Sequence, residues 1–558
     1  MSMGLILERA YAHERRNAGR VFLVQYLPGG AEQTYTWGQV LDEARRMAAH
    51  LHERGLQPGA RIGILSKNCA HFVIAELAIW MAGGVTVALF PTESPRTIAH
   101  VLAHSGTSLL FVGKLDLWAQ QRDAVPADLP CIALPLAPAG HGLPRWGEIM
   151  ERTPPMPGQP LRAGQDLAML TYTSGSTGLP KGVMHSFERI THAGDAMLGR
   201  VRSFHRPGAQ VRFFSYLPLA HVMERAWVAS TALLDEGDSR MFFGESLETF
   251  VADLQRARPT VFLSVPRLWT LFQQRVFEQV PQPKLARLLR VPLLGRFVGR
   301  KVLSRLGLQD VVLAASGAAP IAPELVQWYQ TLGLMMGEGY GMTEDFGCSH
   351  SCTPQHRAVG AVGVPLPGVE VRVGEGGELL VKSPGTMLGY YREPELTAAA
   401  FTDDGFVRTG DLGHYGSDGA LRVSGRVKSL FKTAKGKYVA PEPIENSLNA
   451  GTVVEMSMVA GAGQPAAFGL VVLKPGVQTE LAPQRLAVEI ALQSLLDAVN
   501  TGLAEYERLR MLVVAREPWS IDNGCLTPTL KIRRSAIENA VAARLPDWYA
   551  SEARVQWG

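Results

Sequence analysis

The chain of 558 residues contains little cysteine, with five residues spread between Cys69 and Cys525. Because sparse cysteines in odd number do not build a disulfide framework, we expect reduced thiols and a cytoplasmic protein. Cys348, His350 and Cys352 lie close together in GCSHSC, but a metal centre needs about four ligands and no second cluster supplies the others. We therefore expect an ordinary loop of small residues at that position.

The sequence also lacks a strong charge imbalance and any long apolar run. A net charge of +4 is small for this length, so it points to no nucleic-acid partner. No stretch reaches the ~18 apolar residues that a membrane span requires, and MSMGLILERAYAHERR has no apolar signal-peptide core. With 46% hydrophobic and 19% charged residues, the composition predicts a soluble or peripheral globular protein of several domains.

Strands and helices are predicted to alternate over residues 61–112. RIGILS, VTVALF and SLLFVG read as strands, and CAHFVIAELAIWMAGG and SPRTIAHVLAHSG read as helices between them. The preceding residues 40–51 follow a helical spacing that ends near Gly55. This order predicts an α/β fold with a parallel, helix-covered sheet, in which ligands bind at the carboxyl ends of the strands.

One such strand end carries the clearest candidate site. The apolar run 167–172 predicts a buried strand, and hydroxyl and glycine residues follow it: Thr173, Ser174, Gly175, Ser176, Thr177 and Gly178, with Lys181 shortly after. Glycines allow backbone N–H groups to converge on a ligand, and hydroxyls and a lysine add donors, so the stretch predicts a phosphate-binding loop. Composition alone would equally suit a surface loop. The P-loop spacing fails, because Gly182 rather than Ser or Thr follows the lysine.

The stretch TSGSTGLPKG resembles the phosphate loop of the adenylate-forming enzymes (the ANL superfamily of acyl-CoA synthetases, amino-acid adenylation domains and luciferases). Further motifs follow in that family's order, namely VVLAASGAAP, GEGYGMTE, RTGDLG and LTPTLKIRR, and SYLPLAHVMER resembles long-chain acyl-CoA synthetases in particular. The resemblance covers about residues 35–540. It implies an N-terminal adenylation domain over 1–427, with a small β subdomain at about 355–427, and a mobile α+β domain over 428–558.

The resemblance also implies ATP and CoA as substrates, Mg²⁺ as cofactor, and roles for particular residues. Tyr340 offers a flat face to a purine, Thr343 a hydroxyl to the α-phosphate and Glu344 a hard oxygen to Mg²⁺. Asp411 can accept from both ribose hydroxyls, since a carboxylate only accepts, although Asp in a Gly turn is commonly just a turn former. The other implied nucleotide contacts are Gly317, Ala318, Gly341, Met342 and Arg426.

Four further roles are implied, for the acyl pocket, the adenylation lysine, the hinge and CoA binding. His221 would border the acyl pocket, although a lone His in an apolar run is more often a core residue. Lys531 matches the adenylation lysine by position, whereas an isolated exposed Lys usually serves solubility. Lys428 would be the domain hinge, and CoA would contact Lys435, Gly436 and Lys437, where the family's Gly-Gly is replaced by Lys-Gly.

Residues 281–309 form a basic segment without any acid. Its Lys and Arg residues are interleaved with Leu and Val: Lys284, Arg287, Arg290, Arg296, Arg300, Lys301 and Arg305. Such a surface can lie on anionic lipid, or it can be a solvated face whose aliphatic stems cover apolar neighbours.

We therefore expect an ATP-dependent fatty acyl-CoA synthetase that forms an acyl-adenylate. An enzyme that loads a separate carrier protein, and a ligase for aromatic or other carboxylic acids, remain alternatives. A binding protein built on an inactive adenylation fold is disfavoured by retention of Lys181, Glu344, Asp411 and Lys531.

Overall fold

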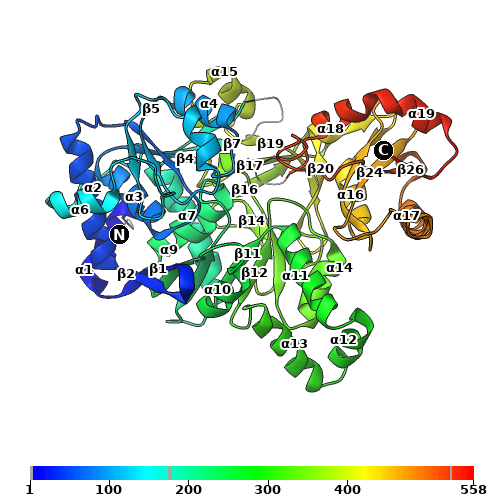
Figure 1. The fold of residues 1–558 in the computed structure, drawn as a ribbon, viewed down its shortest axis with the longest axis horizontal. Coiled ribbons are helices and arrows are strands. Elements are labelled where there is room, and N and C mark those ends of the chain that lie inside the picture. The colour runs from blue at the N-terminus through cyan, green and yellow to red at the C-terminus, as the bar shows by residue number, and fades with distance from the viewer. Residues whose placement is uncertain (1–3, 174–178, 528–530) are drawn as a thin grey trace. The chain divides into compact units, whose positions relative to one another are not determined.

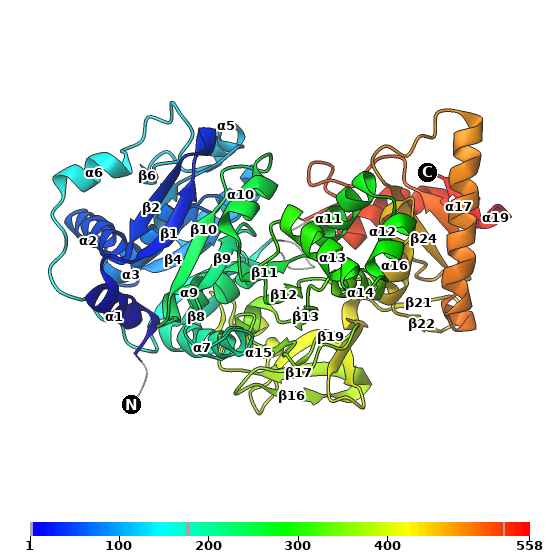
Figure 2. The same ribbon diagram turned by 90° about the horizontal axis from the view of Figure 1, so that it is seen from below.

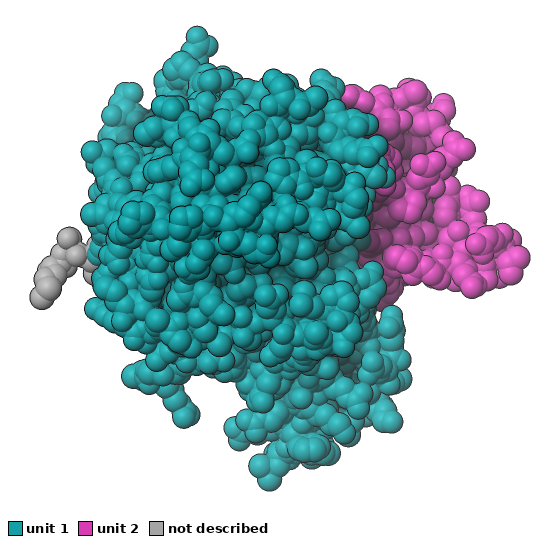
Figure 3. Space-filling view, turned by 60° about the vertical axis from the view of Figure 1, so that its left-hand side comes forward, with its two compact units in different colours: residues 1–319, 325–371, 380–408 teal, residues 320–324, 372–379, 409–558 magenta. Residues whose placement is uncertain are grey.

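The computed structural model describes residues 4–173, 179–527 and 531–558. The chain forms two compact units, which Figure 3 colours separately: unit 1 comprises residues 1–319, 325–371 and 380–408, and unit 2 comprises 320–324, 372–379 and 409–558. Packing therefore divides the chain at about residue 408, ahead of the expected hinge at Lys428. The hinge and the division at 427/428 stay predictions.

A nine-stranded sheet forms one layer of unit 1. Its central strands β9 to β13 and β1 run parallel, and shorter antiparallel strands flank them. Figure 2 shows β1, β10, β9, β11, β12 and β13 side by side. The strands are, in sheet order, β15 Val364–Pro365, β14 His350–Ser351, β13 Met336–Tyr340, β12 Leu313–Ser316, β11 Val261–Ser264, β9 Val211–Ser215, β10 Ser239–Phe243, β1 Val21–Tyr26 and β2 Glu32–Thr36.

A seven-stranded sheet forms the second layer. The predicted strands over residues 61–112 are confirmed as its parallel centre, since β3 pairs with both β4 and β5. The order is β18 Gly389–Tyr390, β8 Lys181–Ser186, β7 Leu167–Thr173, β4 Val85–Leu89, β3 Arg61–Leu65, β5 Thr107–Val112 and β6 Cys131–Ala133. Residues 389–390 lie within the stretch that the resemblance assigns to a β subdomain. In the structure they form β18, which pairs with β8 of this sheet, with Tyr390 opposite Val183, and this corrects the assignment for these two residues.

Helices cover and separate these sheets (Figure 1). All 12 residues of α3 are buried, and the helix packs against β1 of one sheet and β3 and β4 of the other, as its continuous apolar sequence requires. The helices before the basic segment are α1 Ile6–Asn17, α2 Trp37–Glu53, α3 Ala70–Met81, α4 Pro95–Ser105, α5 Trp118–Gln121, α6 Trp146–Arg152, α7 Phe187–Ser203, α8 Val222–Glu224, α9 Thr231–Leu234, α10 Phe250–Ala257 and α11 Pro266–Gln279. Later come α12 Gln282–Leu289, α13 Leu294–Arg305, α14 Pro323–Thr331 and α15 Pro394–Ala400.

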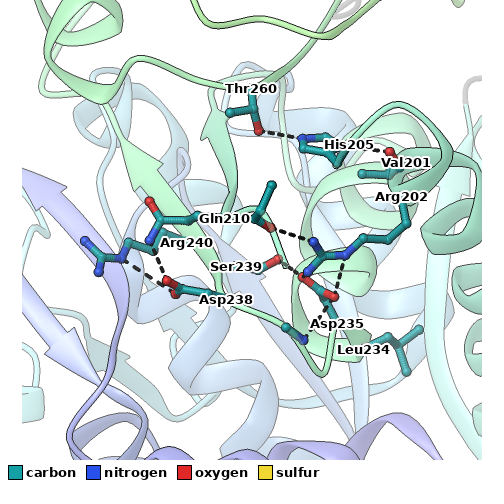
Figure 4. A network of polar contacts seen from close by, with 12 residues as sticks. Val201, Arg202, His205, Gln210, Leu234, Asp235, Asp238, Ser239, Arg240 and Thr260 are labelled. Atoms are coloured by element: carbon teal, nitrogen blue, oxygen red, sulfur yellow. Dashed lines mark hydrogen bonds and ion pairs between the residues drawn. The ribbon is translucent and has the colours of Figure 1, made fainter. Parts of the chain in front are cut away.

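The amino ends of β9, β10 and β11 are fixed by a polar network (Figure 4). Asp235 is buried and accepts hydrogen bonds from Arg202, over 3.0 Å to Nε, and from the Ser239 hydroxyl. His205 contacts the Thr260 hydroxyl at 2.9 Å just before β11 begins. Since this network ties α7 to the strand starts, we assign it a structural role. The candidate residues Gly317 and Tyr340 lie at the opposite, carboxyl ends of β12 and β13.

Unit 2 contains most of a small sheet, whose strands β16, β17 and β19 begin or end in unit 1, and an α+β layer. The small four-stranded sheet has the order β16 Glu370–Val373, β17 Glu378–Lys382, β19 Val407–Tyr415 and β20 Leu421–Arg426, and a turn at residues 374–377 joins the first two strands. A short hairpin of β21 Phe431–Lys432 and β22 Tyr438–Val439 follows. The last sheet comprises β23 Val454–Ala460, β24 Ala467–Leu473, β25 Leu509–Val514 and β26 Val555–Trp557.

The two faces of the last sheet bury separate cores. Side chains alternate along β23, so that Val459 points to a core with α16 Pro441–Asn449 and α17 Ala482–Thr501. Met458 points to the other core, which includes α18 Arg534–Val541 and α19 Leu545–Ala550. Across the described residues of both units, no helix is long and apolar enough to cross a bilayer.

Candidate active site

The strand that follows the predicted phosphate loop positions Lys181 beside an aromatic ring. β7 and β8 pair antiparallel, with Thr173 opposite Lys181, so the loop between them closes a hairpin at the carboxyl end of β7. Lys181 Nζ lies 4.5 Å from the centre of the Tyr390 ring. Ser174, Gly175, Ser176, Thr177 and Gly178 lie outside the described residues, so their phosphate role stays a prediction.

Tyr390 links this lysine to the predicted metal ligand. Its hydroxyl donates to Glu344 Oε1 over 2.8 Å, and only 8% of the tyrosine is exposed. Burial, with the nearby Glu344 carboxylate, raises the pKa of Tyr390 far above its ordinary value, so the phenol remains a donor. The contact brings together Lys181 and Glu344, which are far apart in the sequence.

Glu344 belongs to the 3₁₀ turn Thr343–Asp345, which is held from inside the protein. Asp345 is fully buried and accepts from the Met342 N–H over 3.0 Å, and burial raises its pKa to about 7. His185 Nε2 donates to the Thr343 carbonyl oxygen over 2.9 Å. A Cβ on Gly341 would lie 2.9 Å from the Gly347 backbone, so this position requires glycine. The turn is therefore set by buried groups, while Thr343 and Glu344 remain partly exposed.

The small-residue turn after β12 lies beside the end of β13 and beside α8. A Cβ on Gly317 would meet the Gly339 carbonyl oxygen and Met223 Sδ, each at 3.5 Å. Ala318 adopts φ +65°, a conformation that costs strain in any residue with a Cβ. Tyr340 ends β13, with its ring centre 6.3 Å from that of His350. Gly317, Ala318 and Tyr340 thus share one edge of the nine-stranded sheet.

His221 caps α8 on the same side. Its Nδ1 accepts from the Met223 N–H over 3.2 Å, and its ring meets Phe90 edge-on. Phe90 is thus an aromatic neighbour of His221, and the position of His221 beside an acyl pocket stays a prediction. The Met223 N–H donates to His221, and the Met223 side chain lies beside Gly317. Met223 therefore connects these two residues.

Asn68 anchors the loop that leads to His221. Its amide donates to the Leu217 carbonyl over 2.7 Å and the Ser215 hydroxyl over 2.9 Å, and its oxygen accepts from the Leu219 N–H over 2.9 Å. Glu224 lies 3.5 Å from the same amide, and burial raises the pKa of its carboxyl to about 8. One buried side chain therefore fixes residues 215–219.

Unit 2 carries the predicted ribose ligand in a tight turn. The Thr409 hydroxyl donates to the Leu379 carbonyl over 2.7 Å and accepts from the Asp411 N–H over 3.0 Å. Gly410 has φ +69°, which favours glycine. Arg426 Nε donates to Asp411 Oδ1 over 2.8 Å across the β19–β20 pair. The structure thus pairs Asp411 with Arg426, and the predicted nucleotide contacts of both residues stay predictions.

Lys531 and the other predicted lysines of unit 2 lie on exposed turns. The Thr527 hydroxyl accepts from the Lys531 N–H over 3.0 Å, and the Thr527 N–H donates to the Lys531 carbonyl over 2.8 Å. Just after it, Arg534 binds both carboxylate oxygens of Glu445 at 2.7 and 2.6 Å, which fastens α18 to α16. Lys428 is exposed before β21, and Lys435, Gly436 and Lys437 form the exposed turn of the β21–β22 hairpin.

Sequence reasoning missed Tyr390, Asn68 and Arg534 as positioning residues. The aromatic pair in GTMLGYY was visible, but nothing in it indicated pairing with β8. Asn68 is a polar residue just before a buried helix, and its side-chain amide bonds to residues about 150 positions away. A buried polar residue must find partners, but the sequence does not say which.

Comparison with known proteins identifies the class. The model of the AMP-binding enzyme family matches residues 10–391, which is more than half of the chain. The chain therefore belongs to the AMP-binding enzyme family, and it is an adenylate-forming ligase of the acid–thiol class.

Individual relatives cover nearly the whole length. The long-chain-fatty-acid–CoA ligase FadD15 of Mycobacterium bovis is 29% identical over 97% of this chain and 96% of its own. Human long-chain-fatty-acid–CoA ligase 1 is 28% identical over 93% of this chain and 83% of its own. Among solved structures, the A domain of carboxylic acid reductase from Segniliparus rugosus, in complex with AMP and a co-purified carboxylic acid, has TM-score 0.79 at 21% identity, covering 99% of this chain and 95% of its own. This last likeness shows the fold.

Proposed function

We propose that the protein is a fatty acyl-CoA synthetase, which activates a fatty acid with ATP and transfers the acyl group to CoA. The observation that carries the proposal is the contact series from Lys181 through Tyr390 to Glu344 at the end of β7. The names of the full-length relatives support a fatty acid as substrate and CoA as acceptor. Five free cysteines suit a cytoplasmic location.

The first half-reaction joins the acid to AMP. A carboxylate oxygen of the acid attacks the α-phosphate of ATP, the bond to the β-phosphate oxygen breaks, and pyrophosphate leaves. Negative charge builds on the phosphate oxygens, so the site must supply cations and donors aimed at them. In this proposal Lys181, the loop amides and Lys531 supply these, Thr343 contacts the α-phosphate and Asp411 holds the ribose.

The Glu344 carboxylate is suited to bind Mg²⁺. One carboxylate oxygen is fixed by Tyr390, and a carboxylate is the hard oxygen donor that Mg²⁺ prefers. In the described part of the chain, no cluster of three or more His, Cys, Asp or Glu side chains could hold a metal alone. A Mg²⁺ ion at Glu344 would therefore complete its ligands from water and nucleotide phosphates, and it would neutralise charge there.

The second half-reaction forms the thioester. The CoA thiolate attacks the acyl carbonyl carbon, the bond to the AMP phosphate oxygen breaks, and AMP leaves. In this proposal the exposed turn of Lys435, Gly436 and Lys437 contacts CoA. Because the two half-reactions need different partners, a rotation of the C-terminal part about Lys428 would suit them, and closure would exclude water from the adenylate.

The test is pyrophosphate release and thioester formation with acids of graded length, offered with CoA, with an acyl carrier protein and with neither. We expect CoA-dependent thioester formation that rises with chain length through the medium range, because each buried methylene contributes about 0.8 kcal/mol. Transfer to the carrier only would overturn the CoA assignment. Benzoate or acetate as best substrate by kcat/KM would overturn the fatty-acid assignment.

A further inference from the structure

The basic segment folds into two helices that meet at an exposed apolar tip. α12 and α13 lie at the outer edge of unit 1 (Figure 1). Between the helices and in the first turn of α13, four large apolar side chains are exposed, which we call the α12–α13 tip: Leu293 at 78%, Phe297 at 66%, Val291 at 47% and Leu294 at 43%. Scattered exposed apolar residues are ordinary, but four within seven positions form a patch that calls for a partner.

The inner face of the helix pair is anchored, so the tip is held outward. A Cβ on Gly299 would lie 2.5 Å from the Leu332 carbonyl oxygen, and one on Gly295 would lie 2.3 Å from that of Leu289. These contacts let α13 pack closely against α12 and the residues after α14. Leu285 and Leu303 are buried on the same side. The outward direction of the tip is therefore a property of tight packing and not of a loose loop.

Backbone strain at the tip points to a role beyond folding. Leu293 has φ +65° and ψ −53°, and the Leu294 N–H donates to the Pro292 carbonyl over 2.7 Å. This is a classic γ-turn, a rare and strained conformation for a residue with a side chain. Leu293 is also the most exposed apolar side chain of the tip. Its burial within the described chain therefore does not compensate the backbone strain.

Seven cations lie along the two helices that meet at the tip. Lys284, Arg287, Arg290, Arg296, Arg300, Lys301 and Arg305 are all exposed, and within the described residues none is ion-paired with a carboxylate. Their charge exceeds the net +4 of the whole chain, so the remainder of the protein is net acidic.

We propose that the α12–α13 tip docks the protein on an anionic phospholipid bilayer, with the apolar side chains in the headgroup region and the cations on the lipid phosphates. Exposed leucine and phenylalanine suit the apolar boundary of a bilayer. The arginine and lysine residues of the same helices suit its anionic headgroups. An acidic protein would satisfy the cations but not the protruding apolar side chains. The proposal does not depend on which acid the enzyme activates.

The test is co-sedimentation of the full chain, without substrates, with vesicles of phosphatidylcholine plus phosphatidylglycerol and with vesicles of phosphatidylcholine alone. We expect binding to the anionic vesicles that weakens with added salt. The variant with Arg287, Arg290, Arg296 and Arg300 changed to Gln should bind at least about 10-fold more weakly. A matched variant with Arg20, Arg54, Arg122 and Arg145 changed to Gln has the same net charge and should bind as the parent.

Two further variants test insertion of the apolar side chains. Leu293→Ser with Phe297→Ser keeps every charge and should weaken vesicle binding about 10-fold or more. Phe297→Trp should show a blue-shifted emission with anionic vesicles and quenching by brominated lipid. Equal vesicle binding by the quadruple variant at Arg287, Arg290, Arg296 and Arg300 and by its matched control variant would overturn the proposal. A second result would also overturn it: no vesicle binding, together with a dimer on gel filtration that Leu293→Ser with Phe297→Ser loses and the matched arginine variant keeps. The tip would then join two copies of the chain.

Discussion

Lys181 and Lys531 are both expected to contact ATP phosphates, but the protein holds them in different ways. Lys181 begins a strand of a seven-stranded sheet and lies over the buried ring of Tyr390, which in turn binds Glu344. Lys531 is exposed, and its backbone is held by hydrogen bonds to Thr527 and, three residues on, by the Arg534–Glu445 ion pair. Groups of the first kind are coupled to folding stability, whereas a group of the second kind can change without cost to the fold.

This difference suits a reaction in two steps. A preorganised set of donors must not reorganise when charge develops, which requires packed neighbours. A lysine needed in only one half-reaction must be able to leave, which an exposed turn permits. The predictions below separate activity from stability to test this contrast.

The largest effect is expected from Lys531→Ala. Adenylation should fall about 10²- to 10³-fold, as when one donor to a developing oxyanion is removed. Thioester formation from supplied acyl-adenylate should stay normal, and the melting temperature should not change because the side chain is exposed. Pyrophosphate release and single-turnover thioester assays measure the two steps. Arg533→Ala, an exposed cation two positions further on, is the control and should retain activity. Equal loss in both half-reactions would remove the assigned role.

A smaller effect is expected from Asp411→Asn, which tests whether the contrast holds within unit 2. Asp411 is buried and paired with Arg426, unlike Lys531 in the same unit. Loss of a charged acceptor should weaken ATP binding by roughly 1–3 kcal/mol, measured by calorimetry. The control is Asp418→Asn, which breaks an exposed pair with Arg422 in the turn of the same hairpin. Unchanged ATP affinity in Asp411→Asn would refute the ribose assignment.

Tyr390→Phe should have a more modest effect. The ring over Lys181 stays, but Glu344 loses its donor, so adenylation should fall about 10-fold in kcat/KM. Because Tyr390 is buried, the melting temperature should fall as well, unlike that of Lys531→Ala. Tyr391→Phe, at the neighbouring position, should match the parent in both measurements. Full activity in Tyr390→Phe would mean that the contact with Glu344 has no part in the reaction.

Much of unit 1 could be predicted from the sequence, because its signals are local. The strand and helix pattern over residues 61–112 rests on apolar periodicity with glycine and proline at the boundaries, and every element appears as expected. Asp411 and Arg426 are both implied as nucleotide contacts by the resemblance, and the structure pairs them across a hairpin.

The remaining positioning contacts depend on long-range pairing that leaves little local trace. β18 has only two residues, yet it places Tyr390 against a strand about 200 positions earlier, between Lys181 and Glu344. Asn68 and Glu224 are ordinary polar residues in the sequence. In the fold, the Asn68 amide lies 3.5 Å from Glu224 and also binds Ser215, about 150 positions away. Neither periodicity nor turn chemistry reports such contacts, because they depend on how sheets and helices stack.

The smallest effect on the reaction, and the most specific effect on stability, is expected from Glu224→Gln. Burial raises the pKa of this carboxyl from 4.5 to about 8 in the folded protein. Between these values the unfolded chain has released the proton that the folded chain still holds. The stability contributed by the neutral form is therefore complete below pH 4.5 and is lost as pH rises towards about 8. Glutamine resembles the neutral form and can still accept from Asn68, so its stability should lack this decline, whose slope is at most about 1.4 kcal/mol per pH unit.

Urea unfolding of the parent and of Glu224→Gln at several pH values across this window measures the difference directly. The free energy of unfolding of the variant should gain on that of the parent as pH rises, while adenylation at neutral pH stays within about twofold, because a carboxyl that is already neutral loses no charge on substitution. Lys531→Ala should run parallel to the parent at every pH, since its side chain is exposed in the fold. If Glu224→Gln also ran parallel to the parent, the carboxylate would be ionised in the folded state, and Asn68 would hold a charge rather than a neutral acid.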